Sequence, residues 1–228
     1  MEAFLHNNST PWLLEPDNPS VRYLALRDIL GKVDKNNYAA VLSDPAIKAI
    51  PGLVREEILG DMIHFDMAGR GSMWFFATAV EMGLDRRTPS VEKTAAYLTK
   101  TCQTGTGGFS LNWNPKTALS CRTGDMVSAL IRAGFSDNPV RKGIDWITNS
   151  QRPDGGWLHC PQEDLGDSLN LLFFRKAGKG LRREQNLEVP SCAHATCSCM
   201  RALLDWPEKT PVVTTAISRA VGFFLGKT

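Results

Sequence analysis

Apolar residues in this chain recur at the spacing of a helix. The clearest run predicts an amphipathic helix with one side packed against the rest of the protein. It consists of Val212, Val213, Ala216, Ile217, Ala220, Val221, Phe224 and Leu225. Alternating runs of Val, Ile and Thr bounded by turns, which would indicate strands, are nearly absent. The pattern therefore predicts an all-α protein.

A helical hairpin recurs along the chain. Each copy has a first helix that is apolar almost all round, a turn with proline, an amphipathic second helix and a glycine-rich loop. The copies lie near residues 18–51, 72–109, 121–157 and 192–226. Because a helix that is apolar on every side is buried on every side, we expect the first helices to form an inner layer and the second helices an outer one. One more inner helix is expected at residues 164–178.

The glycine-rich loops carry the most specific sequence motif. Gly107-Gly108-Phe109 recurs 48 residues later within the string Gln151-Arg152-Pro153-Asp154-Gly155-Gly156-Trp157. That string resembles the QW-type repeat of the squalene and oxidosqualene cyclases, whose relatives include the protein prenyltransferase β subunits. We expect its glycines to allow a tight turn after an outer helix, and its Trp to pack under the next hairpin.

The resemblance implies an α/α toroid, in which inner and outer rings of helices surround a central apolar cavity. It covers most of the chain, from about residue 18 to 226, and we expect residues 1–228 to form a single toroid-like domain. At about 48 residues per hairpin, 228 residues give fewer than five units. We therefore expect a barrel of stacked hairpins that is smaller or more open than a full toroid, or one completed by a protein partner or a second copy.

The same resemblance implies a protein like a prenyltransferase or a terpene cyclase, with a cavity for an isoprenoid or a similar hydrophobic small molecule. The Asp-x-Asp-Asp motif with which the cyclases protonate their substrate does not occur in the sequence. Cyclisation by that mechanism is therefore not expected, and whether the protein is an enzyme stays open. The alternative is a non-catalytic scaffold or binding module with a structural zinc ion, because a fold does not determine a function.

Zinc is the cofactor that the resemblance to the prenyltransferase β subunits implies, at the end of the barrel where inner helices start. Residues of the right type near such starts are Cys121, Cys160, Cys192 and His194. Three thiolates and an imidazole form a suitable tetrahedral set for zinc. If all four bind the metal, the site is a closed structural one, whereas three protein ligands leave a position open for water or a substrate thiolate. Two alternatives remain, namely that these cysteines are small buried hydrophobes or that they form a disulfide.

The other cysteines carry no assigned chemistry. Cys197 and Cys199 lie two residues apart within a predicted helix, so they point to different sides, and we expect both to be packing residues. Cys102 is given no role.

Composition excludes several classes of protein. The net charge of +2 and the pI near 8.2 are too mild to indicate a nucleic-acid partner.

No window of 18 uncharged apolar residues predicts a membrane span, and the N-terminus does not have the pattern of a signal peptide. We therefore expect a cytoplasmic protein. The sequence has no Walker-type loop, no Gly-x-Ser-x-Gly and no His-Glu-x-x-His, so nucleotidase and hydrolase functions have no support.

Two groups of residues are candidates for contact with a ligand. Aromatic residues on the predicted inner helices either line a cavity or fill a small barrel: Trp74, Phe75, Phe76, Phe173 and Phe174. A basic cluster either holds a diphosphate or forms a solvated loop. Its members are Arg175, Lys176, Lys179, Arg182 and Arg183.

Overall fold

The structure is a computed structural model that describes residues 9–32, 35–50, 71–110, 118–158 and 190–226. Over these residues the chain is helical, with no sheet and one isolated antiparallel bridge between Gln103 and Phe109. The all-α class is therefore confirmed for the described part of the chain. The helices are α1 (Thr10–Leu13), α2 (Pro19–Leu24), η2 (Ala25–Ile29), α3 (Lys35–Ser43), α4 (Pro45–Lys48), α7 (Ser72–Glu81), α8 (Pro89–Cys102), α9 (Ser120–Arg132), α10 (Asn138–Asn149), α12 (Ala193–Asp205) and α13 (Pro211–Phe224). None of the described helices has both the length and the apolar character needed to cross a bilayer.

The larger helices follow each other as three pairs, α7 with α8, α9 with α10, and α12 with α13. We refer to α7, α9 and α12 as the first helices and to α8, α10 and α13 as the second helices. Proline lies in the first turn of every second helix, as the sequence predicts. Gly83 and Gly134, which follow α7 and α9, have positive φ angles of 98° and 90°. Both adopt the left-handed conformation that commonly ends a helix.

The closest contact between helices joins α9 to α12. A Cβ atom at Gly124 would lie 2.3 Å from the carbonyl carbon of Ser198, so only glycine permits this approach. On one side of that contact the Cys199 thiol donates to the Ser120 carbonyl oxygen at 3.3 Å, and on the other the Ser128 hydroxyl lies 2.6 Å from the Asp205 carboxylate. Ser120 meets Cys199 near the start of α9, and Ser128 meets Asp205 further along both helices, so α9 and α12 run parallel.

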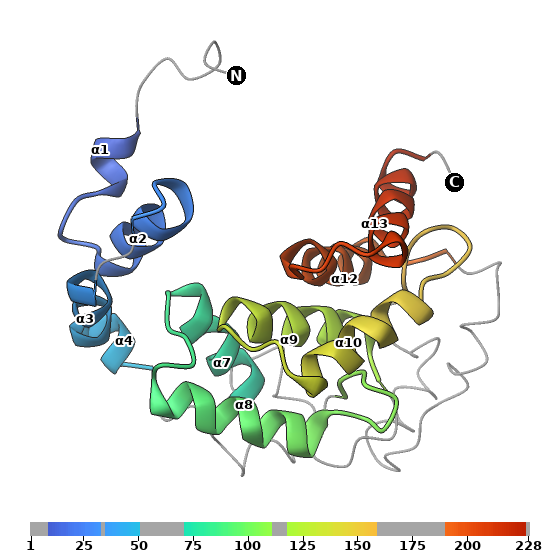
Figure 1. Cartoon of the computed structure of the whole chain (residues 1–228), viewed down its shortest axis with the longest axis horizontal. Coiled ribbons are helices and arrows are strands. Elements are labelled where there is room, and N and C mark those ends of the chain that lie inside the picture. Colours follow the sequence, from blue (N-terminus) through green and yellow to red (C-terminus); the bar gives the residue numbers. More distant parts are fainter. Residues whose placement is uncertain (1–8, 33–34, 51–70, 111–117, 159–189, 227–228) are drawn as a thin grey trace.

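Helix α9 lies between the other two first helices, with α12 above it and α7 beside it in the view of Figure 1. All residues of α9 are buried or half-buried, as predicted for an inner helix. The same prediction is wrong for α7, where Trp74 is exposed, and for α12, where Leu204 is 52% exposed. Each of these helices has α9 on one side only among the described first helices, which leaves its other side accessible.

The two glycine-rich loops are built alike. The side-chain amide of Gln103 donates to the carbonyl oxygens of Gly107 and Pro139, each at 2.8 Å. The amide of Gln151 donates in the same way to Gly155 and to Ala216, again at 2.8 Å. Each glutamine therefore ties its own loop to the next second helix along the chain, α10 in one unit and α13 in the other.

Both loops also press their glycine against that next helix. A Cβ atom on Gly107 would lie 2.3 Å from the carbonyl oxygen of Lys142, and one on Gly155 would lie 2.3 Å from that of Arg219. The positive φ angles of these glycines, 104° and 83°, add a second reason for glycine. The predicted tight turn is therefore present in both copies.

Each loop then anchors an aromatic residue to the next first helix. The backbone N–H of Phe109 donates to the Thr123 hydroxyl in α9 at 2.8 Å, and that of Trp157 donates to the Thr196 hydroxyl in α12 at 3.2 Å. The Trp157 indole is fully buried and donates to the Ile147 carbonyl oxygen at 2.9 Å. Trp157 therefore packs between α10 and the start of the next hairpin, as the motif predicts.

The N-terminal helices pack on the turn between α7 and α8. The Tyr38 hydroxyl lies 2.7 Å from the Thr88 hydroxyl and 3.2 Å from the Asp85 carboxylate. Arg87 donates to the Tyr23 hydroxyl at 2.8 Å and lies over the Tyr38 ring at 3.8 Å. These contacts attach α2 and α3 to the first complete helix pair.

Asp154 connects the second glycine-rich loop to the residue before α12. Its carboxylate accepts hydrogen bonds from the Gly156 N–H at 3.1 Å, from the Ser191 N–H at 3.0 Å and from the Ser191 hydroxyl at 2.7 Å. Burial would raise the pKa of Asp154, but these hydrogen bonds and the nearby charge of Arg152 outweigh it, so the pKa is lowered.

The close approach at Gly124 predicts the effect of Gly124→Ala. The added methyl group forces α9 and α12 apart, and we expect the free energy of unfolding to fall by about 1–3 kcal/mol. Without this contact, alanine inside a helix would stabilise the protein by about 0.5–1 kcal/mol. The change in the free energy of unfolding therefore has opposite signs with and without the close contact. Denaturant unfolding measures the change. Gly105→Ala is the control, because a Cβ atom there meets no other atom within 4 Å, and a stabilising Gly124→Ala would contradict the close contact.

The lowered pKa of Asp154 predicts a pH-dependent loss in Asp154→Ala. At neutral pH we expect a decrease of about 1–2 kcal/mol in the free energy of unfolding, because two donors of Ser191 lose their acceptor. The carboxylate contributes fully above its unfolded pKa of about 3.9, and its contribution falls as the pH drops through the lower folded value. The difference from the wild type should therefore stay constant down to about pH 4 and shrink below it.

Unfolding curves over that pH range test this prediction. Asp137→Ala is the matched control, because the Asp137 side chain is exposed and makes no capping hydrogen bond to α10. A difference between wild type and Asp154→Ala that grows on acidification would rule out the assigned role.

Candidate functional site

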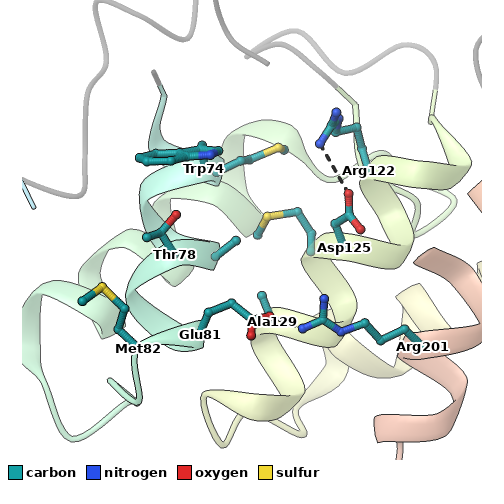
Figure 2. A pocket seen from close by; sticks show the side chains of 11 residues that line it. Trp74, Thr78, Glu81, Met82, Arg122, Asp125, Ala129 and Arg201 are labelled. Atoms are coloured by element: carbon teal, nitrogen blue, oxygen red, sulfur yellow. Dashed lines mark hydrogen bonds and ion pairs between the residues drawn. The ribbon is translucent and has the colours of Figure 1, made fainter. Parts of the chain in front are cut away.

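A cavity of about 360 Å³ lies on the side of the first helices where α7, α9 and α12 meet (Figure 2). A volume of this size falls within the range of small-molecule sites. The cavity is lined by Met73, Trp74, Ala77, Thr78, Glu81 and Met82, by Arg122, Asp125, Met126 and Ala129, and by Arg201. Residues from three hairpins therefore contribute to one site.

The middle of the cavity is apolar. Met73 and Ala77 line it from α7, and Met126 and Ala129 line it from α9. Trp74 lies at one end of the cavity in Figure 2, and its side chain is 44% exposed. Thioether and indole groups are polarizable and adapt to irregular apolar molecules, so this surface suits a hydrophobic ligand.

Glu81 joins all three first helices at the other end of the cavity. Its Oε1 atom accepts from the guanidinium of Arg132 at 2.7 Å and from that of Arg201, which points toward it in Figure 2. Partial burial would raise the pKa of Glu81, but the hydrogen bonds and charges of the two arginines outweigh it. The pKa is therefore lowered, and Glu81 is an anion at neutral pH.

A second ion pair lies at the same end of the cavity as Trp74, on the opposite wall. The Arg122 guanidinium approaches the Asp125 carboxylate at 3.4 Å across one turn of α9. The apolar part of the cavity is thus bounded by Arg122 and Asp125 at one end and by Glu81 and Arg201 at the other.

Aromatic residues of α7 divide between the cavity and the core. Trp74 lines the cavity, whereas Phe75 and Phe76 are buried in the hydrophobic core. The three described aromatic residues of α7 therefore differ in their surroundings. Phe173 and Phe174 lie outside the described residues, as do the expected helix at 164–178 and the basic cluster from Arg175 to Arg183.

The predicted zinc ligands fall at the starts of two first helices. Cys121 is the second residue of α9, His194 is the second residue of α12, and Cys192 immediately precedes α12. Because the two helices run parallel, these residues lie toward the same end of the array. Cys121 is buried, Cys192 is half-buried and His194 is exposed.

No three His, Cys, Asp or Glu side chains among the described residues form a group that could hold a metal ion. Cys121, Cys192 and His194 alone therefore do not make a zinc site in this structure. Cys160, the fourth member of the predicted set, lies outside the described residues. The zinc site stays a prediction, and no chemical step is derived from it.

The remaining cysteines differ in their surroundings. Cys102 and Cys199 are fully buried, and burial raises the pKa of both thiols, most strongly at Cys199. Cys199 is a packing residue as expected, but Cys197 is exposed, so that expectation is wrong for Cys197. All five described cysteines have free thiols.

The sequence did not single out the charged residues of the cavity. Glu81, Arg122 and Arg201 lie on helices whose predicted burial was based on their apolar residues alone. A signal was present: Trp74, Thr78 and Glu81 lie four and three residues apart, which places them on one side of α7. Residues with polar groups that share one side of an otherwise apolar helix indicate that this side is accessible to solvent.

Comparison with known proteins yields no relative. No family model matches the sequence, and neither a curated protein nor a solved structure matches it. The resemblance to the cyclase and prenyltransferase repeats therefore rests on the motif residues themselves.

The zinc prediction is tested by elemental mass spectrometry of the purified protein. We expect one zinc ion per chain and a lower content in Cys121→Ser, Cys160→Ser, Cys192→Ser and His194→Ala, because each change removes one ligand. Cys197→Ser, which changes an exposed thiol outside the set, serves as the control and should retain the metal. A wild-type protein without zinc, even after zinc is supplied, would rule out the site.

Proposed function

We propose that this protein binds a hydrophobic small molecule, with isoprenoids as the ligand class, in the cavity between α7, α9 and α12. The observation that carries the proposal is the cavity itself, which has an apolar middle, an indole at one end and charged side chains at both ends. An apolar body with one polar end matches this distribution of side chains.

We further propose that the helix pairs form an open α/α toroid-like array with this cavity on its inner side. Three features support the proposal. The first helices α9 and α12 are parallel, the same glutamine and glycine contacts recur in two successive units, and the cavity is lined by first helices only, together with the residue that follows α7. An inner ring of parallel helices with an apolar centre would have these properties.

The cavity supports binding better than acid-initiated cyclisation. A proton donor of a cyclase must hold its proton before the reaction, which requires a raised carboxyl pKa. Glu81 has the opposite property, because Arg132 and Arg201 lower its pKa. Ion pairing gives Glu81 a positioning role, since it holds the three helices that line the cavity.

A non-catalytic scaffold with a structural zinc ion is the second candidate. It is favoured by the equivalent positions of Cys121 and His194 as second residues of α9 and α12. A metal bound there would join the starts of two neighbouring hairpins, in the way that a closed zinc site stabilises small domains.

Ligand binding is tested by filling the cavity with Ala77→Phe. The larger side chain occupies the apolar middle, so we expect the affinity for a fluorescent farnesyl alcohol analogue to fall by about tenfold or more, which corresponds to about 1.4 kcal/mol. Ala96→Phe is the matched control, because Ala96 is exposed on α8 away from the cavity. Fluorescence titration measures both variants against the wild type.

Two outcomes would contradict the proposal. One is a wild-type protein that does not bind the probe at all. The other is an equal loss in Ala77→Phe and Ala96→Phe, which would indicate binding elsewhere on the surface. Probe release on adding unlabelled farnesol but not on adding a soluble sugar would establish that the ligand class is apolar.

A further inference from the structure

The three second helices bury equivalent positions. Aligning their N-terminal ends places four residues of each helix at the same four positions. They are Val91, Thr94, Ala95 and Leu98 in α8, Val140, Gly143, Ile144 and Ile147 in α10, and Val213, Ala216, Ile217 and Ala220 in α13. All are buried except Ile217, which is half-buried. Within the described part of the chain, this side of α13 is therefore less covered than the same side of the other two helices.

The cover that α10 has on this side comes from the next hairpin. Ile144 is 5% exposed, and it faces a groove whose opposite wall is formed by Trp206, directly after α12, and by Val213 in the first turn of α13. On this side, a second helix of the array is thus packed against another hairpin of the same repeat.

The uncovered side of α13 is more apolar than its counterparts. Four residues after Ala95, helix α8 has Thr99, and four residues after Ile144, helix α10 has Thr148. Both threonines are half-buried, and both donate to a carbonyl oxygen of their own helix. The equivalent residue of α13 is Val221, which is 44% exposed. Phe224 and Leu225 continue the apolar surface and are 43% and 60% exposed.

Charge distinguishes α13 as well. Helix α8 carries Glu92, Lys93 and Lys100, as expected for a helix that faces water. The only charged residue of the helix Pro211–Phe224 is Arg219, and its guanidinium donates to the Arg152 carbonyl oxygen at 2.6 Å. The surface formed by Ile217, Val221, Phe224 and Leu225, which we name the α13 stripe, therefore contains no charge.

We propose that the α13 stripe is a docking surface for a second copy of this chain, one hairpin of which covers α13 as the next hairpin covers α10. Within one chain the equivalent side is covered by a hairpin of this repeat, so the chemistry of the cover is that of the protein itself.

Sedimentation velocity of the full chain over a wide concentration range tests the proposal. We expect a concentration-dependent dimer, and we expect Val221→Glu to raise the dimer dissociation constant by about a hundredfold, because it buries an unpaired charge in the interface. Val221→Thr, which copies Thr99 and Thr148, should weaken the dimer by a smaller factor without placing a charge on the helix.

Val212→Glu is the matched control, because Val212 is 62% exposed and lies on the opposite side of the same helix. It should leave the dimer unchanged, and circular dichroism establishes that all variants are folded. A wild-type chain that stays monomeric, or equal effects of Val221→Glu and Val212→Glu, would overturn the proposal. The proposal would also be overturned by a monomeric wild-type chain that cosediments with phosphatidylcholine vesicles when Val221→Glu does not. The stripe would then be a membrane contact.

Discussion

Glycine at position 124 sets the distance between α9 and α12, and most of the described structure depends on that distance. With the backbones in contact, Ser128 reaches Asp205, the Cys199 thiol reaches a backbone oxygen of α9, and Arg201 is brought to the cavity. A wider spacing would separate Arg201 from Glu81 and open the cavity to water. The absence of one methyl group thus determines both the packing of the first helices and the shape of the site.

Much of the fold follows from local features of the sequence. In the described part of the chain, the helix positions and the proline in the first turn of each second helix were predicted correctly, because each depends on residues within a few turns. The burial of whole first helices was predicted correctly only for α9. Burial of α7 and α12 depends on which helices lie beside them in space, and apolar periodicity within one helix does not contain that information.

The candidate site was less accessible to sequence reasoning. Trp74 was named as a residue that either lines a cavity or fills a small barrel. The ion pair of Glu81 with Arg201 joins residues 120 positions apart, and each looks like an ordinary surface charge in its own segment. Sequence spacing placed Cys121 and His194 at helix starts, because the repeat gives that information directly. It did not give their side-chain exposure, which depends on how neighbouring hairpins pack.

The paired aromatic and threonine anchors have a consequence for how this protein tolerates change in length. Between the two hydrogen-bonded partners the chain runs for 14 residues in one unit and for 39 in the other, yet the anchor is the same. The same anchor therefore holds across connections of very different length, so its formation does not depend on a fixed number of residues between the aromatic residue and the threonine.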